Sequence, residues 1–82
     1  MFTYLVYPAA DGWRVQLQDA AQWALLPDFQ AAERRARWLA ARANVRGHDS
    51  EIVLLDAAGA RVGRWWAETY TPAAAPARDL AA

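Results

Sequence analysis

Only one segment of this 82-residue chain carries the signals of an α-helix, so a sheet built from the other segments can be covered by a helix on one face only. Pro27 and Asp28 indicate the helix start, where the Asp28 carboxylate can accept hydrogen bonds from the first free amides. Gly47 indicates the end, and we expect the helix to run from about Phe29 to about Asn44. One side of this helix, about 100° wide, carries the apolar residues expected to face the core, which are Phe29, Ala32, Ala36, Leu39, Ala40 and Ala43.

The chain before the helix predicts a β-hairpin. Strand-forming residues dominate two segments, 2–7 and 13–18. The Asp-Gly dipeptide at residues 11–12 is a strong hairpin signal between them. A two-residue turn there pairs Val6 with Leu17 and places Leu5 and Tyr7 on the opposite face, whereas a three-residue turn exchanges the two faces of the first strand.

A second hairpin is predicted after the helix, with strands over residues 51–56 and 61–68 and a turn at Gly59, which can adopt a positive φ. Residues 19–27 lack a clear period, and we expect them to form a connection folded over the edge of the core. The chain is therefore predicted to have an α+β fold of ββαββ order, with a four-stranded antiparallel sheet and one helix packed on one face. The single domain is expected to span residues 1–70, followed by a disordered Pro/Ala-rich tail over residues 71–82.

Adjacent tryptophans, Trp65 and Trp66, lie in the last predicted strand, where neighbouring side chains point to opposite faces. We favour Trp66 in the core and Trp65 outside with Val53 and Leu55, although a different register inverts this. Soluble monomers rarely expose large apolar patches, so we expect a homodimer that buries the helix-free face. Cover by residues 19–27 or by the tail is the alternative. The residues predicted to bind a partner are Trp65, Trp66, Val53, Leu55, Leu5 and Tyr7.

A second predicted surface lies on the outer side of the helix, in the basic part of the chain. Trp38 points away from the apolar side and stands one helical turn from Arg34 and from Arg42. Such a tryptophan can contact a protein partner or stack on a nucleobase. It can also be held against its own helix by a cation–π contact with one of these arginines.

The composition argues against several kinds of chemistry. The chain has no cysteine, which excludes disulfides and thiolate zinc sites and fits a cytoplasmic protein. Its only histidine lies in the run His48, Asp49 and Ser50, and three consecutive residues rarely adopt the geometry of a catalytic triad. No segment is apolar over the length that a membrane span requires, and the zero net charge disfavours an electrostatic nucleic-acid binder. We expect no enzymatic activity, cofactor or metal site, and no membrane partner.

The first hairpin and the helix resemble a family of small bacterial domains of unknown function. The family pattern V-x-P-x-x-D-G-W-x-V precedes an F, an A-R-x-x-A helix, a hydrophobic strand and a D-x-x-G turn. The chain resembles it over about residues 4–62 but lacks the lysines common in that family, and the resemblance implies no activity. The matching residues are Val6, Pro8, Asp11, Gly12, Trp13, Val15, Phe29, Ala36, Arg37, Ala40, Ile52–Leu55, Asp56 and Gly59.

The chain is also similar to the HicB-like antitoxin domains, which place an Asp-Gly hairpin before an alanine-rich helix. That resemblance implies a partial RNase H-like fold with a toxin or DNA partner, but the P-D-L-P-G-C segment expected after the second strand is missing here. We therefore expect a non-enzymatic binding or assembly module that forms a homodimer. The alternative is an antitoxin-like or nucleic-acid-associated accessory protein that uses Arg34, Trp38 and Arg42.

Overall fold

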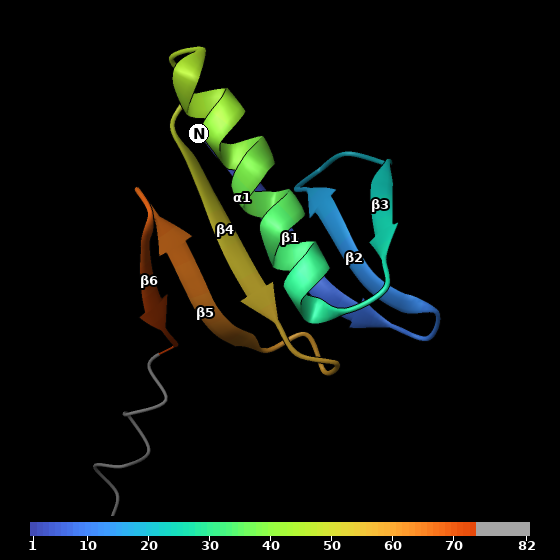
Figure 1. The fold of residues 1–82 in the computed structure, drawn as a ribbon. Coiled ribbons are helices and arrows are strands. Elements are labelled where there is room, and N and C mark those ends of the chain that lie inside the picture. The colour runs from blue at the N-terminus through green and yellow to red at the C-terminus, as the bar shows by residue number, and fades with distance from the viewer. Residues whose placement is uncertain (74–82) are drawn as a thin grey trace, which may run out of the picture.

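One helix packs across one face of a six-stranded sheet in the computed structural model, which describes residues 1–73 (Figure 1). The strand order is β3-β2-β1-β4-β5-β6. The central strands β1 and β4 are parallel, and all other neighbouring pairs in this sheet are antiparallel. The elements are β1 (Phe2–Ala9), β2 (Gly12–Leu17), β3 (Trp23–Leu26), α1 (Phe29–Val45), β4 (Ser50–Leu55), β5 (Arg61–Trp66) and β6 (Thr69–Pro72).

The α+β class with one helix is confirmed, but the predicted four-stranded antiparallel sheet is wrong. Residues 23–26, predicted as a connection, form the edge strand β3, and residues 69–72 form the opposite edge strand β6. Two residues of β6 belong to the predicted tail, and residues 74–82 of that tail lie outside the described part of the chain. With three antiparallel strands before the helix, β3 points the same way as β1. The helix then carries the chain back across the sheet, so β4 runs parallel to β1.

The first hairpin keeps the predicted faces in a different register. Its turn lies at residues 10–11 and pairs Val6 with Val15, which is two residues away from the predicted pairing. Because side chains alternate with a period of two, an even shift leaves each one on its predicted face. Leu5 and Tyr7 therefore point away from α1, as the two-residue turn predicted.

Glycine is required where the third strand joins this hairpin. Gly12 has a φ of 143°, a conformation that residues with a side chain rarely adopt. A Cβ atom at this position would lie 2.6 Å from the carbonyl oxygen of Leu26 in β3. The absence of a side chain at Gly12 thus allows β3 to pair closely with β2.

The helix begins and ends close to the predicted residues. The Asp28 side chain accepts a hydrogen bond of 2.8 Å from the Ala31 amide, and Gly47 after the last turn has a φ of 88°. Four alanines of α1 are buried against the sheet, which brings the helix backbone close to the central strands. Within residues 1–73, no helix is long and apolar enough to cross a membrane. The buried cluster is formed by Tyr4, Val6, Val15, Ala32, Ala36, Ala40, Ile52 and Leu54.

Two hairpins follow the helix. Asp56 accepts two backbone amide hydrogen bonds in the loop between β4 and β5, where Gly59 adopts the predicted positive φ of 84°. The turn between β5 and β6 consists of Ala67 and Glu68, with φ values of 50° and 64°. Two-residue turns of this kind favour asparagine and glycine, so neither residue of this turn is well suited to its conformation.

Candidate functional site

The side of the sheet that α1 leaves uncovered, called here the helix-free face, carries five of the six residues predicted to bind a partner. Leu5 and Val53 are paired at its centre across β1 and β4. Val53 is only 3% exposed, because its own neighbours cover the middle of this face, whereas Trp66 is 37% exposed. The five residues are Leu5, Tyr7, Val53, Leu55 and Trp66.

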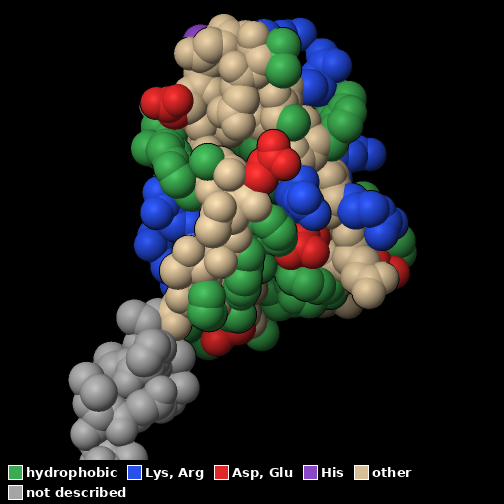
Figure 2. All heavy atoms as spheres, turned by 60° about the vertical axis from the view of Figure 1, so that its left-hand side comes forward, with side chains coloured by type: hydrophobic (Ala, Val, Ile, Leu, Met, Phe, Trp, Pro, Cys, Tyr) green, Lys and Arg blue, Asp and Glu red, His purple; other side chains and the backbone are tan. Residues whose placement is uncertain are grey.

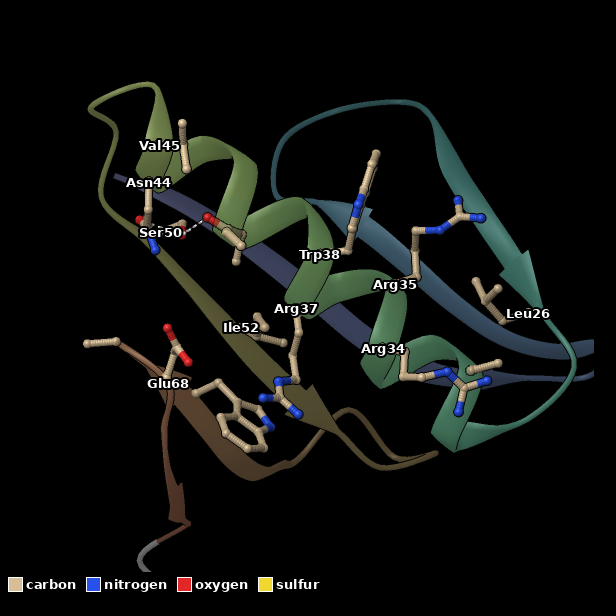
Figure 3. A pocket seen from close by; sticks show the side chains of 15 residues that line it. Leu26, Arg34, Arg35, Arg37, Trp38, Asn44, Val45, Ser50, Ile52 and Glu68 are labelled. Carbon is tan, nitrogen blue, oxygen red and sulfur yellow. Dashed lines mark hydrogen bonds between the residues drawn. The ribbon is translucent and has the colours of Figure 1, made fainter.

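The favoured placement of the two tryptophans is wrong. Trp65 is paired with the buried Ile52 and lies on the helix side, while Trp66 faces away from the helix. The indole nitrogen of Trp65 donates a hydrogen bond of 2.9 Å to Glu33, and the Arg37 guanidinium lies 4.4 Å from its ring centroid. Figure 3 shows Arg37 reaching from α1 toward β5, on the flank of the helix where Glu68 also lies. These contacts make Trp65 part of the packing between helix and sheet, and not part of an exposed surface.

An ion pair on the helix-free face explains this register. Arg64 shares a face with Trp66, and its Nε atom lies 2.6 Å from a carboxylate oxygen of Glu51. The Thr3 hydroxyl donates to the other oxygen at 2.8 Å. Burial raises the pKa of Glu51, but these hydrogen bonds and the charges of Arg64 and Arg61 outweigh it and hold the pKa below its ordinary value. The carboxylate is thereby fixed in its charged form between β1 and β5.

The residues at the opposite end of the helix-free face were not predicted from the sequence. Trp23 and Leu25 of β3 point to this side, and both are exposed, Trp23 at 43%. The Arg14 guanidinium lies 3.9 Å from the Trp23 ring centroid. Tyr7 donates a hydrogen bond of 2.7 Å to Gln16 beside them. The apolar run from Trp23 to Leu26 was the available signal, but its short length does not distinguish a strand from a connection.

The helix-free face is consequently mixed in character and not a continuous apolar surface. Stacked arginine and tryptophan side chains lie toward its two ends, Arg14 on Trp23 and Arg64 at 5.0 Å from the ring centroid of Trp66. Figure 2, which brings the β6 edge of the sheet forward, shows charged side chains set among hydrophobic ones at this edge as well. Such a face combines aromatic contact area with two arginines that are paired with carboxylates.

The second predicted surface lies on the outside of α1. Trp38 is 56% exposed, and the Arg42 guanidinium lies 4.7 Å from its ring centroid, as the predicted cation–π contact requires. Arg34 lines the same open hollow along the helix as Trp38. Figure 3 shows Trp38 and Arg35 extending from α1 on the β3 side, away from Arg37.

The consecutive His48, Asp49 and Ser50 do not assemble as a catalytic group. The His48 ring stacks on Phe2, with ring centroids 4.9 Å apart. The buried Ser50 hydroxyl donates to the carbonyl oxygen of Ala40 at 2.9 Å and lies 3.0 Å from the amide oxygen of Asn44. Ser50 therefore fastens the start of β4 to the last turns of α1. Among residues 1–73, no group of three or more His, Cys, Asp or Glu side chains could hold a metal ion.

Comparison of the chain with protein-family models, with curated proteins and with solved structures finds no match. The two resemblances drawn from the sequence therefore stay predictions. Inferences about function depend on the surfaces that the fold exposes.

Proposed function

We propose that this chain is a non-enzymatic assembly module that pairs with a second copy of itself through the helix-free face. The observation that supports the proposal is the single helix, which covers one side of a six-stranded sheet and leaves Trp23 and Trp66 exposed on the other. Leu5, Tyr7 and Leu55 are only partly covered between them. A second copy would remove these side chains from water.

The composition of this face favours protein contact. Tryptophan, tyrosine and arginine are enriched at the centres of protein interfaces and dominate their binding energy, whereas lysine is depleted, and the chain contains no lysine. Arg14 lies 3.6 Å from Asp11, and Arg64 is paired with Glu51. Arg61, which is paired in register with Leu55, has no ion pair within residues 1–73. The two arginines stacked on tryptophans are neutralised, however, which limits the repulsion between two copies face to face.

The dimensions of the sheet are sufficient for a modest dimer. Six strands about 4.8 Å apart and about 20 Å long present roughly 500 Å² on each copy. Face-to-face packing would bury about 1,000 Å² in total, near the lower limit for a specific interface. We therefore expect a dimer that dissociates on dilution. The absence of cysteine supports its assembly in a reducing compartment, such as the cytoplasm.

The oligomeric mass of the full chain tests the proposal. We expect sedimentation equilibrium to give a dimer at high micromolar concentration, and Trp66→Ser and Trp23→Ser, made singly, to shift the equilibrium toward monomer. Trp38→Ser is the matched control, because it removes an indole that is even more exposed but lies on the outer side of α1. It should leave the dimer intact.

Two results would contradict the proposal. A wild-type chain that is monomeric at every concentration tested would contradict the proposed homodimer. Equal dissociation by Trp38→Ser would show that the contact lies elsewhere. Trp65→Ser does not serve as a test, because Trp65 is bonded to Glu33 and its loss should weaken the fold itself.

A further inference from the structure

We infer that the outer side of α1 is a docking surface for an acidic amphipathic helix of a partner protein. This surface, called here the outer stripe, consists of an apolar row bordered by arginines on the side of the helix away from the sheet. Its apolar row is formed by Ala31, Trp38, Ala41 and Val45. Arg34 lies within this row, between Ala31 and Trp38, and the row is bordered by Arg35, Arg42 and Arg46.

The apolar row follows the period of a helix-binding surface. Ala31, Trp38 and Val45 are separated by seven residues each, and Ala41 lies between the last two, so they fall on one side of the helix. The buried alanines of α1 lie on the other side. Helices that dock into grooves or pair with other helices use anchors at this spacing. The helix thus has two apolar sides, and the sheet covers one of them.

The outer stripe is accessible and has a concave part. Val45 is 87% exposed and Trp38 56%. A shallow hollow of about 310 Å³ is lined by Trp38, Ala41, Arg42, Val45 and Arg46. A hollow beside a tryptophan can accept an aliphatic side chain of the partner, and the row from Ala31 to Val45 is about 21 Å long. It can therefore seat about four turns of a second helix.

The arginine charges of the outer stripe favour an acidic partner. Within residues 1–73 the ion pairs are Arg14 with Asp11 and Arg64 with Glu51, so none of the four arginines of the outer stripe is paired with a carboxylate in the described part of the chain. Glu33, on the inner flank of the helix, is held by Trp65. Two copies of the outer stripe would repel each other, whereas glutamate or aspartate beside the apolar positions of a partner helix would pair with the arginines.

An acidic helix fits this surface better than a nucleic acid does. A phosphate backbone would use the arginines but leave Ala41 and Val45, which lie beside them, without an apolar contact. Only Trp38 offers a stacking platform on this side of α1. The zero net charge of the chain also weakens long-range attraction to a polyanion.

Direct titration of the full chain tests the inference. The probe is a fluorescent synthetic peptide of about 18 residues with leucine at the a and d positions and glutamate at e and g, compared with a scrambled peptide of the same composition. We expect saturable binding by fluorescence anisotropy, at least about tenfold tighter for the amphipathic peptide. Trp38→Ala and the double variant Arg34→Glu/Arg42→Glu should each weaken it about tenfold or more.

A second peptide and a further protein variant separate docking from general charge and from self-association. A peptide with lysine in place of glutamate should bind the double variant more tightly than it binds the wild type. The peptide is then positive and the two substituted positions of the protein are negative, so the attraction is restored with opposite charges. Trp66→Ser lies on the helix-free face and should leave peptide binding unchanged, so failure of the dimer proposal does not decide this one. Circular dichroism of each variant checks that the exposed substitutions leave the fold intact.

Three results of the peptide titration would overturn the inference. They are no saturable binding of the acidic peptide up to millimolar concentration, equal binding of the scrambled peptide, and unchanged binding by Trp38→Ala. Tighter binding of a fluorescent single-stranded oligonucleotide, with the steep salt dependence of phosphate contacts, would assign the outer stripe to nucleic acid and would also overturn it.

Discussion

The alanine side of α1 is expected to set the distance between helix and sheet, and Ala36→Leu tests this directly. Ala36 is completely inaccessible to solvent and belongs to the same buried cluster as Val6 and Ile52. The added carbons have no free space there, so either the helix must lift or its neighbours must shift. Overpacking of this kind costs about 1–3 kcal/mol of unfolding free energy. A chain of this size has about 4–12 kcal/mol in total, so the loss is a large fraction.

The measurement is urea unfolding followed by far-UV circular dichroism, at one fixed protein concentration because self-association would add to the apparent stability. We expect Ala36→Leu to lower the midpoint with little change in the slope, and the melting temperature to fall by about 4–8 °C for each kcal/mol lost. Ala41→Leu is the matched control, since Ala41 is exposed on the same helix and leucine forms helices almost as well as alanine. It should change stability by less than about 0.5 kcal/mol. The packing argument would be refuted if Ala36→Leu were as stable as the wild type, or if Ala41→Leu lost as much stability as Ala36→Leu.

Two other predictions concern the edge of the sheet and its ion pair. The double substitution Ala67→Asn/Glu68→Gly should raise the unfolding free energy by about 0.5–1.5 kcal/mol, because it gives the β5–β6 turn residues that tolerate positive φ. A urea midpoint no higher than that of the wild type would contradict this. Because the folded-state pKa of Glu51 lies below its ordinary value of 4.5, its contribution is present above about pH 4.5 and is lost as the pH falls through the folded-state value. Glu51→Gln should therefore have a lower unfolding free energy than the wild type at neutral pH. This difference between the two proteins should shrink on acidification. A difference that does not depend on pH would contradict the role assigned to the ion pair with Arg64.

Local signals in the sequence were sufficient to predict the helix and two of the hairpins. Asp28 caps the first turn of α1, and Gly47 ends it, because capping and positive φ depend on residues only a few positions apart. Gly59 marked the turn between β4 and β5 for the same reason. The outward position of Trp38 followed from helical periodicity, and its contact with Arg42 from one turn of spacing.

The order of the strands could not be obtained in this way. Trp23 and Tyr70 lie in short edge strands whose sequences, taken alone, fit a connection or a tail equally well. They form strands because β2 and β5 offer unpaired backbone groups beside them. The parallel pairing of β1 with β4 depends in turn on β3, since a third strand reverses the direction in which the chain enters the helix.

The amino-acid sequence by itself determined the helix, its alanine side, the two main hairpins and the presence of one tryptophan on each side of β5. Only the tertiary structure decided which tryptophan that is. Trp65 packs under α1 because Glu33 and Arg37 reach it from the helix, and Trp66 faces outward because Arg64, on its side of the strand, is paired with Glu51. These partners are distant in sequence, and their contacts exist only once helix and sheet have come together.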